Sequence, residues 1–132
     1  MTGIRRFIQN EAGAAMVEFA VIAVVFFFLL VGIVEFARAA WIKSSITAAA
    51  RDGARYATVH GSESGRVATS DSIRAYVTPR IPVSPVRIAA SWPSGNAPGN
   101  VVEVTVKYGY QPLIAVPFTD TLSSVSRLVI VF

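Results

Sequence analysis

The chain has 132 residues, of which 53% are hydrophobic and 15% are charged, and its formal net charge is +4. This length allows one small domain, and the apolar excess excludes a disordered chain. The sequence has no cysteine and one histidine, His60. It therefore excludes disulfide scaffolds, iron–sulfur clusters, thiol nucleophiles and zinc sites built from cysteines or paired histidines. We expect neither a metal nor a cofactor.

A polar N-terminal segment, residues 1–13, precedes an uncharged apolar run of about 16 residues from Phe19 to Val34. A helix of only that run would span roughly 24 Å, which is less than the 30 Å or so of a bilayer's hydrocarbon core. A helix over residues 14–34 would span roughly 31 Å and fits. The sequence therefore predicts one transmembrane helix over residues 14–34, with Glu18 inside its boundary.

Glu18 is the unusual residue of this helix, because a carboxylate within a membrane is costly. Its side chain either reaches back to the headgroups or meets a positive charge supplied by another chain. Basic residues flank the segment on both sides, so they favour neither orientation strongly. A short basic N-terminal segment before a long polar domain favours a cytoplasmic N-terminus and an extracytoplasmic C-terminal domain.

The residues Gly13–Phe19 read GAAMVEF and follow a short basic leader. This stretch resembles the type IV prepilin processing site, in the variant of tight-adherence (Flp, type IVc) pili. The resemblance implies cleavage between Gly13 and Ala14 by a membrane peptidase, with Glu18 and Phe19 as the fifth and sixth residues of the mature chain. Cleavage would leave a free amine on Ala14, about 6 Å along the helix from Glu18. We expect the amine of one subunit to pair with Glu18 of the next and to set the register of assembly.

The segment Ser45–Ala57 reads SITAAARDGARYA, which is similar to the AARxGARxA stretch of TadE-like minor pilins, or pseudopilins. Together the two motifs identify the chain as resembling a TadE-like minor pilin of the tight-adherence system. The resemblance implies a non-enzymatic role in pilus assembly by priming, capping or incorporation. The implied partners are the major Flp pilin, other minor pilins, the inner-membrane assembly platform, the prepilin peptidase and membrane lipid. No nucleic-acid partner is expected.

Residues 35–60 contain no proline and predict an amphipathic extension of the same helix. An apolar stripe recurs there at steps of four and three residues. The stripe consists of Ile42, Ile46, Ala49, Gly53 and Tyr56. It packs either on the chain's own sheet or on neighbouring subunits. Arg51 and Arg55 lie largely off the stripe, where they are either solvated or make polar contacts.

Residues 61–132 predict a small extracytoplasmic α+β head. Its expected elements are a short helix, Ser72–Val77, capped by Ser70 or Asp71, and three strands, Val86–Ser91, Val101–Tyr110 and Ser126–Phe132. The fold expected is a long N-terminal helix with a small three-stranded antiparallel sheet and one short extra helix. The apolar segment Leu113–Phe118 lies in a loop, where it either covers the core or forms an exposed contact.

Two other interpretations stay open. An A-x-A-like sequence ends at Ala39, and signal-peptidase cleavage there would release a soluble domain. A simple signal-anchored protein would instead retain Met1.

An enzyme would need a catalytic set, and the set that can be drawn is His60 with Asp71 or Ser62. A lone histidine at a helix end is more often a cap or a solvated residue, so we expect no enzyme.

Overall fold

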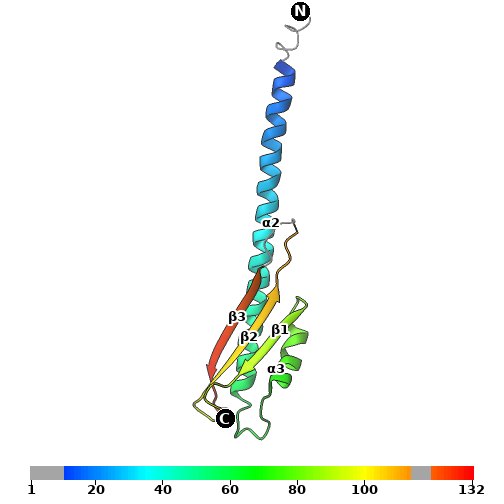
Figure 1. Ribbon diagram of the computed structural model, residues 1–132. Coiled ribbons are helices and arrows are strands. Elements are labelled where there is room, and N and C mark those ends of the chain that lie inside the picture. The colour runs from blue at the N-terminus through cyan, green and yellow to red at the C-terminus, as the bar shows by residue number, and fades with distance from the viewer. Residues whose placement is uncertain (1–10, 114–119) are drawn as a thin grey trace, which may run out of the picture. The chain divides into compact units, whose positions relative to one another are not determined.

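The computed structural model describes residues 11–113 and 120–132. In chain order its elements are α2 (Glu11–Thr58), α3 (Ser70–Val77), the 3-10 helix η1 (Thr78–Arg80), β1 (Val86–Ser91), β2 (Val101–Gly109) and β3 (Thr121–Val129) (Figure 1). Contacts divide the chain into two compact units, which meet between Ala37 and Arg38. The fold prediction is confirmed: the chain is α+β, with one long helix, one short helix and a three-stranded antiparallel sheet.

The long helix α2 ends at Thr58, two residues before the predicted end at His60. The hydroxyl of Thr58 donates to the carbonyl of Arg55, and the amide of Val131 donates to the carbonyl of Thr58 at 2.9 Å. Terminal helix carbonyls need partners from outside the helix. Here the segment after β3 supplies one, so the helix stops where that segment crosses it.

The three strands form a meander in the order β1-β2-β3, with antiparallel pairing throughout. Val102, Val104 and Val106 of β2 are fully buried, whereas the residues between them face the other side of the sheet. Successive side chains of a strand point to opposite faces, so the valines define the inner face. The strand predicted over Val101–Tyr110 is therefore confirmed, and it ends one residue earlier, at Gly109.

The predicted position of the last strand was wrong. It runs from Thr121 to Val129 rather than from Ser126 to the C-terminus. Its whole length pairs with β2, from Thr121 opposite Gly109 to Val129 opposite Val101. The first half of β3 reads TLSSVS and has few apolar residues, so the sequence does not indicate a strand there. It forms a strand because it pairs with β2. Most of the apolar segment 113–118 lies outside the described residues.

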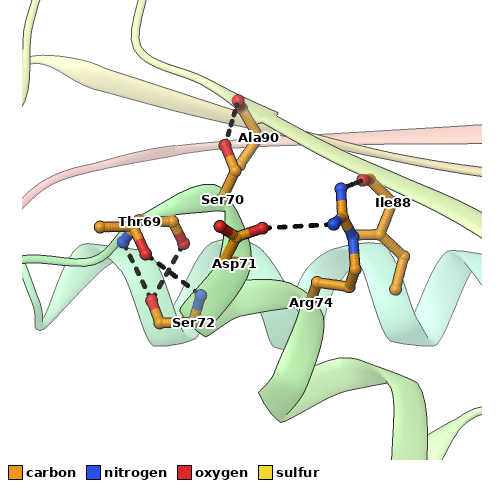
Figure 2. A network of polar contacts seen from close by, with 7 residues as sticks. All are labelled: Thr69, Ser70, Asp71, Ser72, Arg74, Ile88 and Ala90. Carbon is orange, nitrogen blue, oxygen red and sulfur yellow. Dashed lines mark hydrogen bonds and ion pairs between the residues drawn. The ribbon is translucent and has the colours of Figure 1, made fainter.

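The short helix α3 begins with a capping box. The amide of Ser72 donates to Oγ1 of Thr69 at 3.2 Å, and the amide of Thr69 donates to Oγ of Ser72 at 2.9 Å (Figure 2). These bonds satisfy two backbone donors at the helix N-terminus. The cap is therefore Thr69, and the prediction of Ser70 or Asp71 was wrong by one or two residues.

Helix α3 also covers the free edge of β1 (Figure 1). Oγ of Ser70 donates to the carbonyl of Ala90 at 3.2 Å, and the guanidinium of Arg74 donates to the carbonyl of Ile88 at 3.4 Å (Figure 2). Unpaired strand edges are templates for unwanted pairing. On this edge of the sheet, side chains of α3 donate hydrogen bonds to two of the carbonyls of β1.

The core lies between the inner face of the sheet, α3 and the second half of α2. Among the described residues, its fully buried members include no aromatic residue: they are Ala50, Ala54 and Ala57 of α2, with Ile46, Ile73, Val77 and the three valines of β2. A core this small is marginal without disulfides, so close contact between its elements matters more than bulk.

Candidate functional site: an exposed apolar helix joined to a packed one

The processing motif lies at the beginning of α2. Gly13 and Ala14 are within the first turn of the helix, which starts at Glu11 rather than at the predicted Ala14. The first four amides of a helix have no partner within it. The peptide bond between Gly13 and Ala14 is therefore in the least restrained part of α2. Ala14 is exposed.

From Ala14 to Val34, almost every side chain of α2 is exposed, although nearly all are apolar. The large exposed residues are Met16, Val17, Phe19, Val21, Ile22, Val24–Leu30, Val31, Ile33 and Val34. The most apolar 18-residue window of this helix has a mean hydropathy of 2.9, and none of it is buried. An apolar surface on all sides of a helix needs lipid or other helices around it. By length and composition this helix can cross a membrane.

Glu18 is the one acidic residue of this apolar part between Gly13 and Val34. It is exposed, one helical turn from Ala14, and Phe19 beside it is 73% exposed. In a hydrocarbon environment this carboxylate would need a cation or a path to water. Within the single chain, the position presents an acid outward on an otherwise apolar surface.

Beyond Arg38 the same helix changes character. Ile42, Ile46, Ala49 and Gly53 are buried, and Tyr56 is half-buried against the core. A Cβ atom placed on Gly53 would lie 3.1 Å from Cγ1 of Val104 and 3.1 Å from Cγ2 of Val77. The helix thus approaches the sheet and α3 so closely that a methyl group at position 53 would displace its neighbours by a few tenths of an ångström. The stripe lies against the chain's own sheet.

Arg51 and Arg55 are exposed, and in the described part of the chain neither side chain makes a hydrogen bond or an ion pair. Arg55 lines a surface cavity together with Asp52, Val59 and the aromatic residues beside them. Both arginines are therefore available to solvent or to another molecule.

The triad that could be drawn around His60 is not assembled. Nδ1 of His60 lies 2.8 Å from the carbonyl of Tyr56, and its ring stacks on the Tyr56 ring at 4.1 Å between centroids. The carboxylate of Asp71 instead pairs with Arg74 at 3.2 Å. Within the described residues, no group of three or more acidic or histidine side chains could hold a metal.

Comparison with known proteins finds one family model that matches part of the helix. Residues 13–55 match the model of the TadE-like protein family. The match covers about a third of the chain and runs from Gly13 of the processing motif to Arg55 of the second motif. It confirms the resemblance predicted from those two motifs. The family is associated with the tight-adherence pilus and is not a family of enzymes. No curated protein and no solved structure matches the chain.

The TadE-like segment therefore contains both parts of α2, the exposed apolar one and the packed one. Its match ends before the sheet begins, so the α+β head has no counterpart in the comparisons. Sequence reasoning missed two features of that head. One is Gly61, where an added Cβ would lie 1.8 Å from the carbonyl oxygen of Phe132.

The second missed feature is a column of four stacked groups. Tyr56 stacks on Tyr76 at 4.7 Å between centroids, His60 stacks on the other side of Tyr56, and the guanidinium of Arg80 lies 3.8 Å from the Tyr76 centroid. The column links the end of the TadE-like segment to α3 and η1. Aromatic spacing at one helical turn, Tyr56 to His60, is the one signal of it in the sequence.

Proposed function

We propose that this chain is a minor pilin, or pseudopilin, of a tight-adherence (Flp, type IVc) pilus. A prepilin peptidase removes residues 1–13, and the mature chain helps assembly by priming, capping or incorporation. The observation that carries this proposal is the combination of a family match beginning at Gly13 with an apolar helix exposed on every side. Such a helix is suited first to a bilayer and then to a bundle of like helices.

In this proposal the N-terminus is cytoplasmic, the apolar part of α2 spans the inner membrane, and the head lies outside. The partners are the major Flp pilin, other minor pilins, the assembly platform and the peptidase. The role needs no catalytic group of this chain, because the peptidase acts on it.

Glu18 sets the register in this mechanism. Cleavage creates an amine on Ala14, and a neighbouring subunit shifted by one helical turn, about 5.4 Å, brings that amine to the height of Glu18. A buried ion pair adds little net stability, but an unpaired buried carboxylate is strongly unfavourable. The pair therefore selects one axial offset among those that the featureless apolar surface would allow.

The alternative cleavage after Ala39 would remove a contact of the head. Arg38 donates to the carbonyl of Gln111 at 2.8 Å and lies 5.4 Å from the centroid of the Tyr110 ring. A soluble product beginning at Ala40 would lose both contacts. The geometry thus favours a head that stays attached to its helix.

The deciding experiment is N-terminal sequencing of the protein recovered from cells. The proposal expects Ala14 as the first residue, and it expects Gly13→Leu to leave the leader attached. Ala20→Leu, a matched change in the apolar helix, should be processed normally. A mature chain that begins at Ala40, or that retains Met1, would overturn the proposal.

A second experiment tests the register. Glu18→Ala should insert into the membrane in wild-type amounts but should not copurify with sheared pili or with other pilins. Glu63→Ala, which removes an exposed acid of the head, serves as the control. Normal incorporation of the Glu18 variant would show that assembly does not depend on this carboxylate.

A further inference from the structure

The outer face of the sheet carries a shallow, open cavity of about 540 Å³ at the end where β1 begins and β2 ends. Its lining consists of Pro85, Arg87, Lys107, Gly109 and Thr121. These residues lie on the face opposite the buried Ile88 and Val106, because neighbouring strand residues point to opposite sides. The cavity is therefore separate from the core.

Two basic residues lie opposite each other in this cavity. Arg87 of β1 and Lys107 of β2 are partners in the strand register. Like charges directly opposite each other destabilise a sheet, so this pairing has a cost that folding alone does not explain. In the described part of the chain, neither side chain makes a hydrogen bond or an ion pair. On the same face, Arg127 by contrast binds Glu103 at 2.6 Å.

The rest of the cavity suits an anion. None of the described lining residues is acidic, and Thr121 adds a hydroxyl. A Cβ placed on Gly109 would meet nothing within 4 Å, so the backbone there is open to a ligand. The nearest acid in sequence, Asp120, accepts a hydrogen bond from the amide of Thr121 at 2.7 Å. A guanidinium and an ammonium side by side match a phosphate, which the first binds as a fork and the second as a point charge.

The same end of the sheet is tied to α2. Arg38 donates to the carbonyl of Gln111, just beyond β2, and Lys43 donates to the carbonyl of Ser123 in β3. Arg38 comes four residues after Val34, the last residue of the apolar run. Whatever the conformation, four residues span at most roughly 14 Å. Chain connectivity alone therefore keeps this end of the head within reach of the bilayer surface.

We propose that the Arg87–Lys107 cavity binds the phosphate group of an anionic phospholipid at the outer surface of the membrane. The inference rests on the membrane insertion in the proposed function, but not on cleavage or on pilus assembly. Anionic lipids attract basic groups held near the surface. Such binding would hold the head against the bilayer until the subunit is extracted into an assembly.

Binding can be measured by calorimetry on the full-length chain in a neutral detergent. The titrants are dihexanoyl phosphatidylglycerol, dihexanoyl phosphatidylcholine and inorganic phosphate. We expect saturable binding of phosphatidylglycerol alone. The double variant Arg87→Gln/Lys107→Gln should weaken it by about tenfold or more, since two charge-assisted hydrogen-bonding groups are lost. Arg51→Gln/Arg55→Gln removes the same charge elsewhere and should bind like the wild type.

Removing the opposed cations should not reduce the melting temperature, so a binding loss in the double variant would not reflect unfolding. Equal binding by the double variant, or no binding of either phosphate-bearing anion by the wild type, would overturn the proposal. If inorganic phosphate binds as tightly as phosphatidylglycerol, the site is one for free phosphate and its assignment to lipid is wrong. A chain that binds phosphatidylglycerol but keeps its leader in cells would contradict the proposed function alone.

Discussion

The closest approach of α2 to the head is at Gly53, and it makes a sharp prediction. In Gly53→Ala, the new methyl group would lie 3.1 Å from methyl groups of Val104 and Val77 and 3.2 Å from one of Ile73. All three neighbours are fully buried. Each would have to move by a few tenths of an ångström in a core that is packed like a crystal.

Two effects of opposite sign decide the outcome. Replacing glycine by alanine inside a helix stabilises it by about 1 kcal/mol. Overpacking a well-packed core typically costs about 1–3 kcal/mol. Three simultaneous contacts, on two different elements, leave little room for relief by one side-chain rotation. We therefore expect a net loss of about 1 kcal/mol, which lowers the melting temperature of a domain of this size by about 4–8 °C.

The measurement is a thermal melt of the full-length chain in detergent, followed by near-ultraviolet circular dichroism. The tertiary signal of Trp92, which packs against the core, reports the head rather than the membrane helix. Gly32→Ala is the matched control, because an added Cβ there meets nothing within 4 Å. It should leave the melting temperature of the head unchanged.

Val104→Ala sharpens the test, because it removes one of the methyl groups that the new Cβ would meet. In the double variant with Gly53→Ala, the two losses should be less than additive, with a coupling of about 0.5 kcal/mol or more. The reasoning is refuted if Gly53→Ala raises the melting temperature, or if the two changes are additive. Either result would mean that the helix can move away from the sheet at no cost.

Three further changes test the head with the same melt. Gly61→Ala would place a Cβ 1.8 Å from the carbonyl oxygen of Phe132, and backbone must move, so we expect a loss of about 2 kcal/mol or more. Thr69→Ala removes the cap of α3 and should cost about 1 kcal/mol, whereas Thr69→Ser should retain most of the stability. Glu103→Gln breaks an ion pair whose Arg127 side chain is 69% exposed, so the loss should be below about 1 kcal/mol and should shrink in high salt.

The features that sequence predicted well are those decided by neighbours along the chain. The apolar run from Phe19 to Val34 and the stripe from Ile42 to Tyr56 follow from helical spacing alone. The strand from Val101 was predicted because apolar residues alternate there, and the strand Val86–Ser91 was predicted with its observed bounds. In each case the local pattern and the burial of the side chains agree.

The features that sequence did not predict depend on partners far along the chain. The first half of β3 is polar and becomes a strand because β2 pairs with it. Gly61 matters because the backbone of Phe132, 71 residues further along the chain, lies directly beside it. The opposition of Arg87 and Lys107 exists only in the observed register, since a shift by one residue would place them on opposite faces. No local periodicity carries such information.

The two halves of α2 differ in the size of their apolar side chains, and this difference matches what surrounds each half. In the first half large apolar side chains surround the helix, which is the composition that lipid and like helices accept. In the second half Ala49, Ala50, Gly53, Ala54 and Ala57 form a nearly flat side, which lets a sheet of only three strands lie close. A head with few large core residues gains stability from that closeness. Enlarging a residue on the flat side should therefore be more harmful than changing a large residue in the exposed half, where the side chains are not buried by other described residues.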